Sequence, residues 1–538
     1  MFTPTGSDPR SAGSLPLAVI VATGLLYVPL IEGGWIGDDH AMVSDNPALT
    51  AVGTAWTQVV HADSGPLYRP LTVWTHALVQ ALHGGPLGEH IVNMGLHLVA
   101  VALVASIATA LGARARLAWL GAAVFGMHPG VTEAVGWISG RGDLCAMVLT
   151  LAAWRAILAG RYPVAGLLIA FTPFFVETWV AVPLTALAWM AATRKLVPIT
   201  LLFGWIGAGI YAFLRLRLGL GLPAGSPPAD PLGALGALAT HTVRLILDPT
   251  APDALPPLVP FFAGGVLALV VTLPMLVALR GRPLIAAWIA PLLLVVPTLS
   301  ASAQSGLLSD RAIYPMFCGV GILVAHALEQ LARRLDQAKE RDPRPVWASL
   351  PVAVAWVLPL GLAAFAAQRA GAWMDESHAY GASYRKDPEN PYAAFHAAEQ
   401  LRTSNGNCEA ALPLYDKART RVPAAGNAML TCLVLEKKLD EAVQLGTDLL
   451  TTLPDDPAPA RLTAWTLLRL GRAADAVPVA EELTRRDALN STSWDVLGMA
   501  RAMAGDTEGA RAAYQEAVRL DPSDENAREG LAQLPPER

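Results

Sequence analysis

Charged residues are scarce in this chain of 538 residues: Asp, Glu, Lys and Arg together make up 15% of it. An average soluble domain has about 25%. Hydrophobic residues make up 53% of the chain, and its mean hydropathy is +0.41. This balance excludes an ordinary soluble protein over most of the length and favours a lipid bilayer as the surroundings. The net charge of −5 is too small to indicate a nucleic-acid partner.

Cysteine is also scarce, with four residues at positions 145, 318, 408 and 432. Their spacing excludes the common metal-binding cysteine motifs. Cys145 and Cys318 lie in apolar runs and are interpreted as packing residues. Cys408 and Cys432 would form a disulfide in an oxidising compartment, and both are also acceptable as buried thiols.

Apolar runs long enough to cross a membrane are frequent before about residue 367 and absent after about residue 376. A span needs about 20 mainly apolar residues. We therefore expect an all-α chain with a polytopic membrane domain at 1–375 and a soluble helical domain at 376–538. About eleven spans are predicted, at 14–32, 90–112, 117–136, 143–159, 163–176, 178–192, 196–213, 258–279, 284–303, 311–332 and 346–367.

Basic residues of the short loops gather on one side of these spans, which the positive-inside rule makes the cytoplasm. The first run has no small-residue cleavage site before Glu32 and is expected to remain as a span. Eleven spans that start inside place the large loop 33–89 and the C-terminal domain outside the cytoplasm. Runs at 52–62, 71–83 and 233–247 have helical periodicity and would lie at the outer interface as amphipathic helices. The basic residues are Arg114, Arg116, Arg161, Arg194, Lys195, Arg280, Arg282, Arg333, Arg334, Lys339, Arg341 and Arg344.

From about residue 390 the sequence repeats with a period close to 34, the period of tetratricopeptide repeats (TPR). In each copy, a Gly or Lys is expected to end the first helix of a hairpin, and a small Ala lets the second helix pack closely. Stacked hairpins leave a concave surface for peptides, so we expect this array to bind a protein or peptide. A spacer or dimerisation element is the alternative. The copies run from Gly406 to Ala411, Lys437 to Ala442, Gly471 to Ala476 and Gly505 to Ala510, with breaks at Pro391, Pro423, Pro457 and Pro522.

Polar residues gather on the outer side of the predicted spans, where charges are costly and usually functional. The pair Asp38 and Asp39 follows the first span and would bind a divalent cation or take a proton from an attacking hydroxyl; an ordinary acidic helix cap is the alternative. Arg141 is expected in a loop between Gly140 and Gly142, where its rigid fork of donors would suit a phosphate. The other candidates are Arg69, His90, Asn93, His97, His128, Glu133, Asp143, Glu177, Asp310, Arg311 and Tyr314.

Three strings carry a family resemblance: IGDDHAMVSDNPAL, YRPLTVWTHALVQALHGGPLGEHIVNMGLH and HPGVTEAVGWISGRGDLCAM. With the repeats placed last, their order resembles that of the transmembrane-and-TPR O-mannosyltransferases, within the GT-C superfamily of membrane glycosyltransferases. The resemblance extends over essentially the whole chain. It implies transfer of a sugar, such as mannose, from a polyprenyl-phosphate carrier to an acceptor outside the cytoplasm, with protein as the expected acceptor. The Ala-, Leu-, Gly- and Arg-rich composition suggests a bacterium, and so an inner-membrane location.

The same resemblance implies roles for particular residues. A phosphate leaving group needs fixed positive charge and an attacking hydroxyl needs a carboxylate, so the roles agree with the chemistry of the residues. The general base or acceptor-orienting group would be Asp38 or Asp39; Arg141, and Arg311 with Tyr314, would hold the lipid phosphate; and Glu133 and Asp143 would fix these cations or the sugar.

Two departures from the family pattern bear on donor specificity. The family commonly has a Lys before the glutamate, where this chain has Val176 before Glu177. Its late motif has a Tyr directly after the Arg, where this chain has Ala312. Two other functions stay open: a non-catalytic membrane scaffold for envelope assembly, and a transporter of a lipid-linked saccharide. The sequence has no inverted repeat of the kind that transporters often show.

Overall fold

The computed structural model describes residues 14–36, 39–46, 49, 68–177, 182–193, 198–218, 310–341, 356–374, 391–454 and 456–535, with isolated positions at 284–291, 384 and 388–389. All regular secondary structure in these residues is helical, which confirms the all-α prediction. The predicted segments 52–62, 233–247 and 258–279, most of 284–303, and Asp38 lie outside the described residues.

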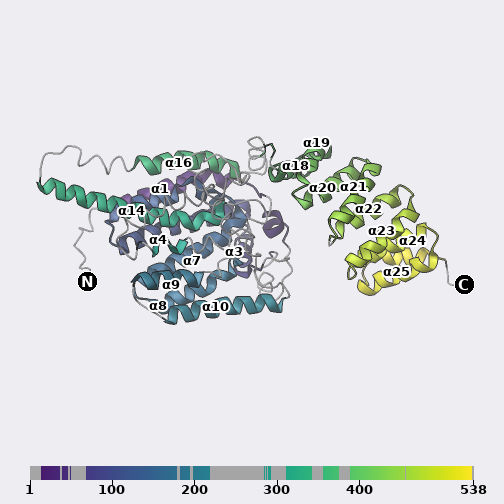
Figure 1. The fold of residues 1–538 in the computed structure, drawn as a ribbon, viewed down its shortest axis with the longest axis horizontal. Helices are drawn as coiled ribbons and strands as arrows, with labels where there is room; N and C mark the ends of the chain where they lie inside the picture. The colour runs from purple at the N-terminus through teal and green to yellow at the C-terminus, as the bar shows by residue number, and fades with distance from the viewer. Residues whose placement is uncertain are drawn as a thin grey trace. The chain divides into compact units, whose positions relative to one another are not determined.

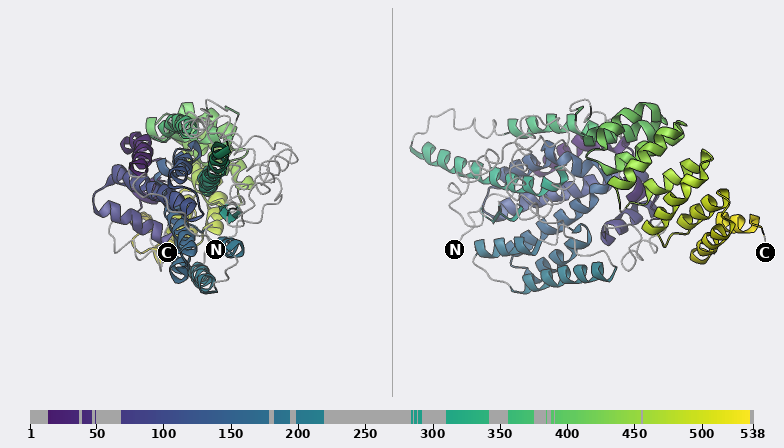
Figure 2. Two further views of the ribbon diagram at one scale, coloured as in Figure 1. Left: turned by 90° about the vertical axis from the view of Figure 1, so that its left-hand side faces the viewer. Right: turned by 45° about the vertical axis from the view of Figure 1, so that its right-hand side comes forward.

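The chain divides into two compact units, Met1–Ala382 (unit 1) and Ser383–Arg538 (unit 2). In unit 1, α4 packs against α5 and α7, α5 against α14, and α8 against α10 (Figures 1 and 2). Its helices are α1 (Leu15–Tyr27), η2 (Val28–Glu32), η3 (His40–Ser44), α3 (Pro70–Ala81), α4 (Gly85–Ala110), α5 (Ala115–Gly126), η5 (Pro129–Val131), α6 (Thr132–Gly136), η6 (Ile138–Gly140), α7 (Arg141–Leu158), α8 (Tyr162–Phe171), η7 (Thr172–Phe174), α9 (Val182–Thr193), α10 (Pro198–Arg217), α14 (Asp310–Arg341), α16 (Val357–Ala370) and η10 (Gly371–Trp373).

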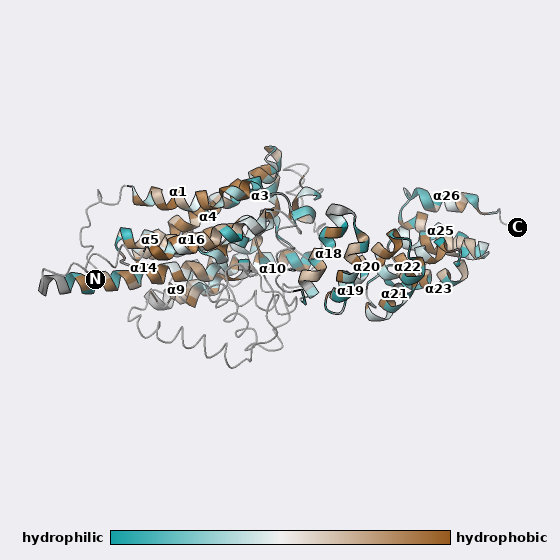
Figure 3. Ribbon diagram, turned by 90° about the horizontal axis from the view of Figure 1, so that it is seen from above, coloured by the Kyte–Doolittle hydropathy of each residue, from teal (hydrophilic) through white to brown (hydrophobic). Residues whose placement is uncertain are grey.

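Several helices of unit 1 are suited to a bilayer. Their outward-facing side chains are apolar, as with Leu17 at 66% and Phe213 at 60% exposed, and Figure 3 shows hydrophobic residues along α1, α4 and α14. Water would not favour such surfaces, so the chain is an integral membrane protein. Within the described residues, the segments long and apolar enough to cross a membrane are Leu15–Glu32, Gly85–Ala110, Pro198–Arg217 and Ile313–Gln337. They confirm apolar helices at the predicted spans 14–32, 90–112, 196–213 and 311–332.

The predicted span at 117–136 is wrong as a single helix. α5 ends at Gly126, and only short helices follow as far as Gly140. Pro129 is the physical reason, because the residue before a proline is pushed out of the helical region. His128 accordingly has an extended backbone, with φ −73° and ψ 132°, and its side chain accepts a hydrogen bond from the N–H of Gly130. The break creates a compact turn region before α7.

Close packing of α5 against α14 brings this turn region near the start of α14. A Cβ on Gly121 would collide with the backbone of Gly321, and a Cβ on Gly321 with that of Gly121, so both positions require glycine. The two helices therefore approach more closely than larger side chains allow. α14 also contacts η5 and α6. Residues of the first turn of α14 thus lie beside the segment that follows the proline break.

Unit 2 is a series of helical hairpins with its own buried core. The predicted ends of the first helices are confirmed, since Lys437 and Gly471 have positive φ of 59° and 71° and are the second residues after α20 and α22. The small alanines of the repeats, such as Ala442 and Ala476, are fully buried. Its helices are α18 (Pro391–Asn405), α19 (Cys408–Ala418), α20 (Pro423–Leu435), α21 (Leu439–Thr452), α22 (Ala458–Arg469), α23 (Ala473–Arg486), α24 (Ser491–Met503), α25 (Thr507–Leu520) and α26 (Glu525–Gln533).

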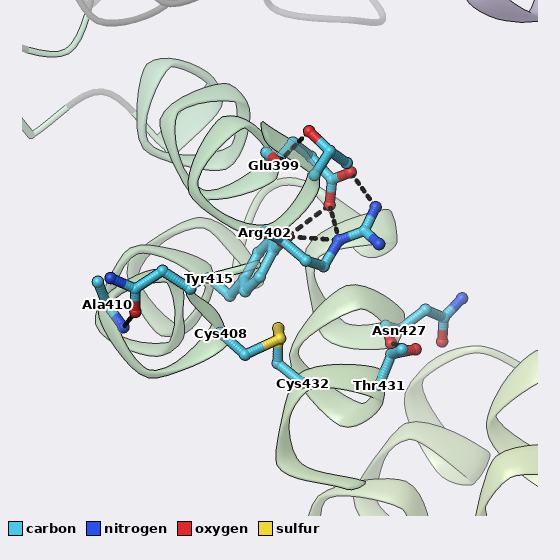
Figure 4. Close-up of a disulfide and its surroundings, with 10 residues drawn as sticks. Glu399, Arg402, Cys408, Ala410, Tyr415, Asn427, Thr431 and Cys432 are labelled. Atoms are coloured by element: carbon cyan, nitrogen blue, oxygen red, sulfur yellow. Dashed lines mark hydrogen bonds and ion pairs between the residues drawn. A yellow bond between two sulfur atoms is a disulfide. The ribbon is translucent and has the colours of Figure 1, made fainter. Parts of the chain in front are cut away.

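A disulfide joins Cys408 of α19 to Cys432 of α20, so it links the first hairpin to the second (Figure 4). Both cysteines are buried. The two Cα atoms are 5.1 Å apart, within the ordinary range for a disulfide. Of the two alternatives for this pair, the structure thus shows the disulfide. Cys145 and Cys318 are free and buried, as expected of packing residues.

Candidate functional site

Asp39 lies just after the first span and is fully buried. Its Oδ1 accepts hydrogen bonds from the backbone N–H of Ser139, at 2.7 Å, and from the hydroxyl of the same residue. Its Oδ2 accepts a hydrogen bond from the N–H of Ile36 at 3.0 Å. The carboxylate of Asp39 therefore ties the end of the first span to the turn that precedes α7.

The turn itself is held from the side of α4 by Asn93. The Asn93 amide donates hydrogen bonds to the carbonyls of Trp137, at 3.0 Å, and Ile138, at 3.4 Å. On the other side, the indole N–H of Trp137 donates to the carbonyl of Ile36 at 3.1 Å. We call the segment 137–140 the site turn. It is fixed by contacts to α4 and to the segment that follows the first span.

Arg141 does not lie in an accessible loop, and that prediction is wrong. It is the first residue of α7 and is completely buried. Its Nη1 lies 2.6 Å from Oε2 of Glu89, its Nε donates to Oδ1 of Asn93 at 2.8 Å, and its Nη2 donates to the carbonyl of Glu89 at 2.6 Å. Glu89 also contacts Nδ1 of His76 at 2.9 Å. These buried partners occupy the guanidinium fork that a phosphate would need.

The glycines beside Arg141 serve the packing of the chain. A Cβ on Gly142 would lie 2.8 Å from the carbonyl oxygen of Phe175 and 2.7 Å from Cγ2 of Val176. A Cβ on Gly140 would lie 2.8 Å from the carbonyl oxygen of Ala134. Real Cβ atoms do not approach so closely. The close approach that the sequence predicted is therefore made by this chain's own backbone.

Arg311, in the first turn of α14, stands over the site turn. Its Cζ lies 4.1 Å from the ring centroid of Trp137, the geometry of a cation–π contact. Its Nε is 3.8 Å from Oε1 of the buried Glu133. The Arg311 side chain remains 24% exposed. A guanidinium held in this way still has donors available for an anion. Asp310 begins the same helix.

A second arginine of the outer side is fully paired. Arg69 Nε and Nη2 donate to the two carboxylate oxygens of Glu177 at 2.7 and 2.8 Å. Burial opposes both charges, but the pairing outweighs it, so the pKa of Glu177 lies below its ordinary value and that of Arg69 above. Asp143, in the first turn of α7, adds to the field that favours charged Arg69. Val176, beside this pair, is buried and packs near Gly142.

The structure does not bring the predicted histidines and Tyr314 to an open site. His97 Nε2 donates to the carbonyl of Gly126 at 3.1 Å, which leaves Nδ1 to accept the Tyr314 hydroxyl at 2.9 Å. Tyr314 is fully buried, so the prediction that it holds a phosphate with Arg311 has no support in this geometry. His128 stacks on Phe317 with ring centroids 4.1 Å apart. His90 is buried beside Gly33.

Reasoning from the sequence missed three residues that organise the site: Trp137, Ser139 and Glu89. Trp137 and Ser139 lie inside the string that carried the resemblance, but neither is charged, so residue type gave no signal. Glu89 directly precedes His90 and does carry a signal, because a carboxylate within an apolar run requires a partner. Its partner, Arg141, is 52 residues away and is assigned only by the structure.

Metal binding at the acidic pair stays a prediction. Among the described residues, no group of three or more His, Cys, Asp or Glu side chains is arranged to hold a metal ion. Asp38 is not among those residues.

Comparisons with known proteins agree with the predicted repeats and with the predicted family resemblance. The tetratricopeptide repeat family model matches residues 461–525. The chain is similar to protein O-mannosyl-transferase Tmtc2 of Drosophila melanogaster, 34% identical over 146 residues, which cover 25% of this chain and 16% of the relative. It is also similar to human protein O-mannosyl-transferase TMTC4, 32% identical over 145 residues, which cover 22% of this chain and 20% of the relative.

The predicted resemblance to O-mannosyl-transferases is confirmed over this stretch. It spans only a fifth or less of the length of these relatives. Among solved structures, MamA from Desulfovibrio magneticus RS-1 is 20% identical, with 26% of this chain and 81% of MamA covered and a TM-score of 0.25. The TPR protein YrrB is 16% identical, with 37% and 97% covered and a TM-score of 0.26. Scores this low do not bear on function.

Proposed function

We propose that this protein is a membrane glycosyltransferase of the GT-C type that moves a sugar from a polyprenyl-phosphate carrier to a protein acceptor outside the cytoplasm. The names of the relatives favour mannose as the sugar. The observation that carries the proposal is the site turn. Through Ser139 it holds Asp39 of the acidic pair, and through Trp137 it holds the partly exposed guanidinium of Arg311. The site turn thus holds both the segment that carries Asp39 and the partly exposed guanidinium of Arg311.

This pairing suits transfer from a sugar phosphate. The acceptor hydroxyl oxygen forms a bond to the anomeric carbon while the bond from that carbon to the phosphate oxygen breaks. The hydroxyl proton passes to a carboxylate, and the leaving phosphate keeps the electron pair. Arg311 would stabilise the charge on that phosphate. Arg69 and Arg141 are less suited to this role because carboxylates already bind them.

Within the acidic pair, the geometry suggests a division of roles. Asp39 accepts three hydrogen bonds and so has little capacity left to receive a proton. We assign it the task of positioning the segment, and we assign Asp38 the role of general base. A divalent cation would be held, if one is used, by the same pair.

The disulfide supports an extracytoplasmic location for unit 2. Disulfides persist in oxidising compartments and are rare in the cytoplasm. The same side follows from the basic loops and the odd number of predicted spans. We therefore propose that the repeats and the acidic pair lie on the outer side of a bacterial inner membrane.

The direct test is to delete the gene and compare envelope glycoproteins and lipid-linked sugars by mass spectrometry. We expect proteins to lose a hexose that returns with the wild-type gene and not with an Arg311→Ala variant that inserts normally. A complementing Arg311→Ala variant would exclude Arg311 from donor binding. Unchanged protein glycosylation with altered lipid-linked sugar on one side of the membrane would instead indicate the transporter. No change in protein glycosylation or in lipid-linked sugar would favour the non-catalytic scaffold.

Unit 2 is proposed to hold the acceptor. A protein truncated after about residue 385 keeps every outer-side polar residue of unit 1, including Asp39 and Arg311. It should still bind and slowly hydrolyse the lipid-linked sugar, while transfer to protein is impaired. If this truncation glycosylates its acceptor normally, the repeats are not the acceptor platform, and a lipid or a small glycan becomes the favoured acceptor.

A further inference from the structure

One face of α22 is exposed along its whole length. Arg461, Trp465 and Arg469 are spaced four residues apart and so lie one above another on that face. All three are exposed, with Trp465 at 39%. A large aromatic side chain gains little from contact with water, so an exposed tryptophan between two cations indicates a binding surface.

The repeat places this face among the first helices of successive hairpins. α22 packs against α20 and α24, which begin the hairpins on either side. In the 34-residue period, Arg469 corresponds to Leu435 on α20 and Met503 on α24, which are 63% and 54% exposed. The position of Trp465 corresponds to Thr431, and Figure 4 shows Thr431 on the side of α20 away from the disulfide. The cationic stripe of α22 therefore has exposed apolar neighbours on both sides.

The two arginines of the stripe have no acidic partner within the described part of the chain. Arginines on other helices of unit 2 commonly do, as with Arg472 and Asp475 or Arg402 and Glu399. The segment 391–538 has 22 acidic and 16 basic residues, a net charge of −6. On an array with a net negative charge, these two arginines thus form a local patch of positive charge on one helix face. The contacts inside the array do not account for it.

We propose that Arg461, Trp465 and Arg469 form a docking surface for an extended protein segment. This segment carries an aromatic side chain with one acidic side chain on each side of it. A guanidinium binds a carboxylate through two parallel hydrogen bonds, and an indole stacks on an aromatic ring. Eight helical residues separate the arginines by about 12 Å. Four residues of an extended chain cover about 13 Å, so an acidic–x–aromatic–x–acidic spacing matches the stripe.

This inference deepens the proposed function, on which it rests only for the identity of the segment as part of the acceptor. Binding itself is independent of sugar transfer. The probe is a fluorescein-labelled peptide of about ten residues in which two aspartates flank a phenylalanine at that spacing. Its anisotropy is measured with the full-length protein in detergent, without a sugar donor. A second peptide has asparagines in place of the aspartates.

We expect the aspartate peptide to bind and the asparagine peptide to bind at least tenfold more weakly. Arg461→Ala with Arg469→Ala, and separately Trp465→Ala, should each weaken binding about tenfold, the loss typical of hot-spot truncation. Higher salt should weaken binding to the wild type, because the contacts are ionic and exposed. Arg519→Ala is the matched control: it removes one arginine of the second helix of a hairpin, where it pairs with Glu516, and should leave binding unchanged.

Equal binding of both peptides, or normal binding by the double arginine variant and by Trp465→Ala, overturns the proposal. So does a change in oligomeric state of the arginine variants by light scattering, which would make the stripe a self-association surface. Preferential binding of the wild type to phosphatidylglycerol vesicles in place of the peptide would likewise overturn it. An Asp39→Ala protein should bind the peptide normally, so loss of sugar transfer with intact peptide binding concerns the proposed function alone.

Discussion

A buried ion pair of unit 1 and an exposed ion pair of unit 2 differ in how much each is expected to contribute to stability. In unit 1, Arg141 and Glu89 are both completely buried. In unit 2, Arg472 and Asp475 are 48% and 56% exposed, a type of pair that recurs at helical spacing. Buried charges must be paired because the bilayer and the core offer no water, whereas exposed pairs contribute little to stability. A buried pair is therefore needed for stability, whereas exposed arginines that have no acidic partner among the described residues, such as Arg461 and Arg469, are available to bind another molecule.

The largest effect should follow from breaking the buried pair. Glu89→Ala leaves the guanidinium of Arg141 buried without its carboxylate, and such losses typically cost about 3–5 kcal/mol. We expect a correspondingly lower temperature of thermal unfolding for the purified protein in detergent. Glu89→Leu combined with Arg141→Met should recover a large part of the loss, since both charges are then absent. A double variant no better than Glu89→Ala would mean that the pair is not the source of the effect.

The disulfide gives the next effect and is specific to unit 2. Cys408→Ala with Cys432→Ala releases a loop of 24 residues and should cost about 3 kcal/mol of local stability. Hydrogen exchange of the α19 and α20 amides in the full-length protein would measure it. Reducing agent should have the same effect on the wild type and none on the variant. Unchanged exchange in the wild type under reducing conditions would show that the bond contributes no stability.

A pH effect between about pH 4 and 6 is expected in unit 2. Asp495 of α24 is buried, and within the described residues its Oδ1 has no hydrogen-bond partner. Burial, aided by the charge of Asp524, raises its pKa to about 6 from an unfolded value of 3.8. The folded state thus binds this proton more tightly, so stability is greatest below about pH 4 and falls as pH rises through 6. The total loss is at most about 3 kcal/mol.

Asp495→Asn removes that titration. We expect it to stabilise α24 at pH 7 and to flatten the dependence between pH 4 and 7. The measurement is hydrogen exchange of α24 after correction for the intrinsic effect of pH on exchange. A wild-type protein whose α24 becomes more protected as pH rises would contradict the assignment.

The smallest effect on stability is expected from breaking an exposed ion pair of unit 2. Arg472→Ala breaks an exposed pair with Asp475, and exposed pairs contribute about 1 kcal/mol or less. We expect exchange of the α23 amides to change little. A loss as large as that of Glu89→Ala would remove the distinction between the two units.

The fold was largely readable from the sequence because its signals are periodic. Apolar runs predicted the membrane helices, and the 34-residue period predicted the hairpins, including the helix end at Lys437. The prediction of one helix at 117–136 was wrong because a hydropathy average does not detect the local effect of Pro129 on the backbone.

The candidate site was only half readable. Charge pointed to Asp39 and Arg311, but a charged residue type cannot show whether its partner is a ligand or another side chain. Arg141 was misplaced for that reason, since Glu89 lies 52 residues away in sequence. Trp137 and Ser139 contribute through geometry, which composition does not encode.

The proposed function requires that the acidic pair and Arg311 act together on a lipid-linked sugar. It is tested most directly by incubating the purified protein with radiolabelled polyprenyl-phosphate mannose and membrane proteins from the deletion strain. We predict protein-bound label with the wild type and about 10²–10⁴-fold less with Asp38→Ala, the loss typical of a general base. Asp39→Ala should also be much reduced. Asp38→Ala should retain the wild-type thermal stability of unit 1, whereas Asp39→Ala leaves the buried N–H groups of Ser139 and Ile36 without their acceptor, so its transfer is measured at a temperature where it stays folded. Full transfer by both single variants and by the double variant would contradict the account.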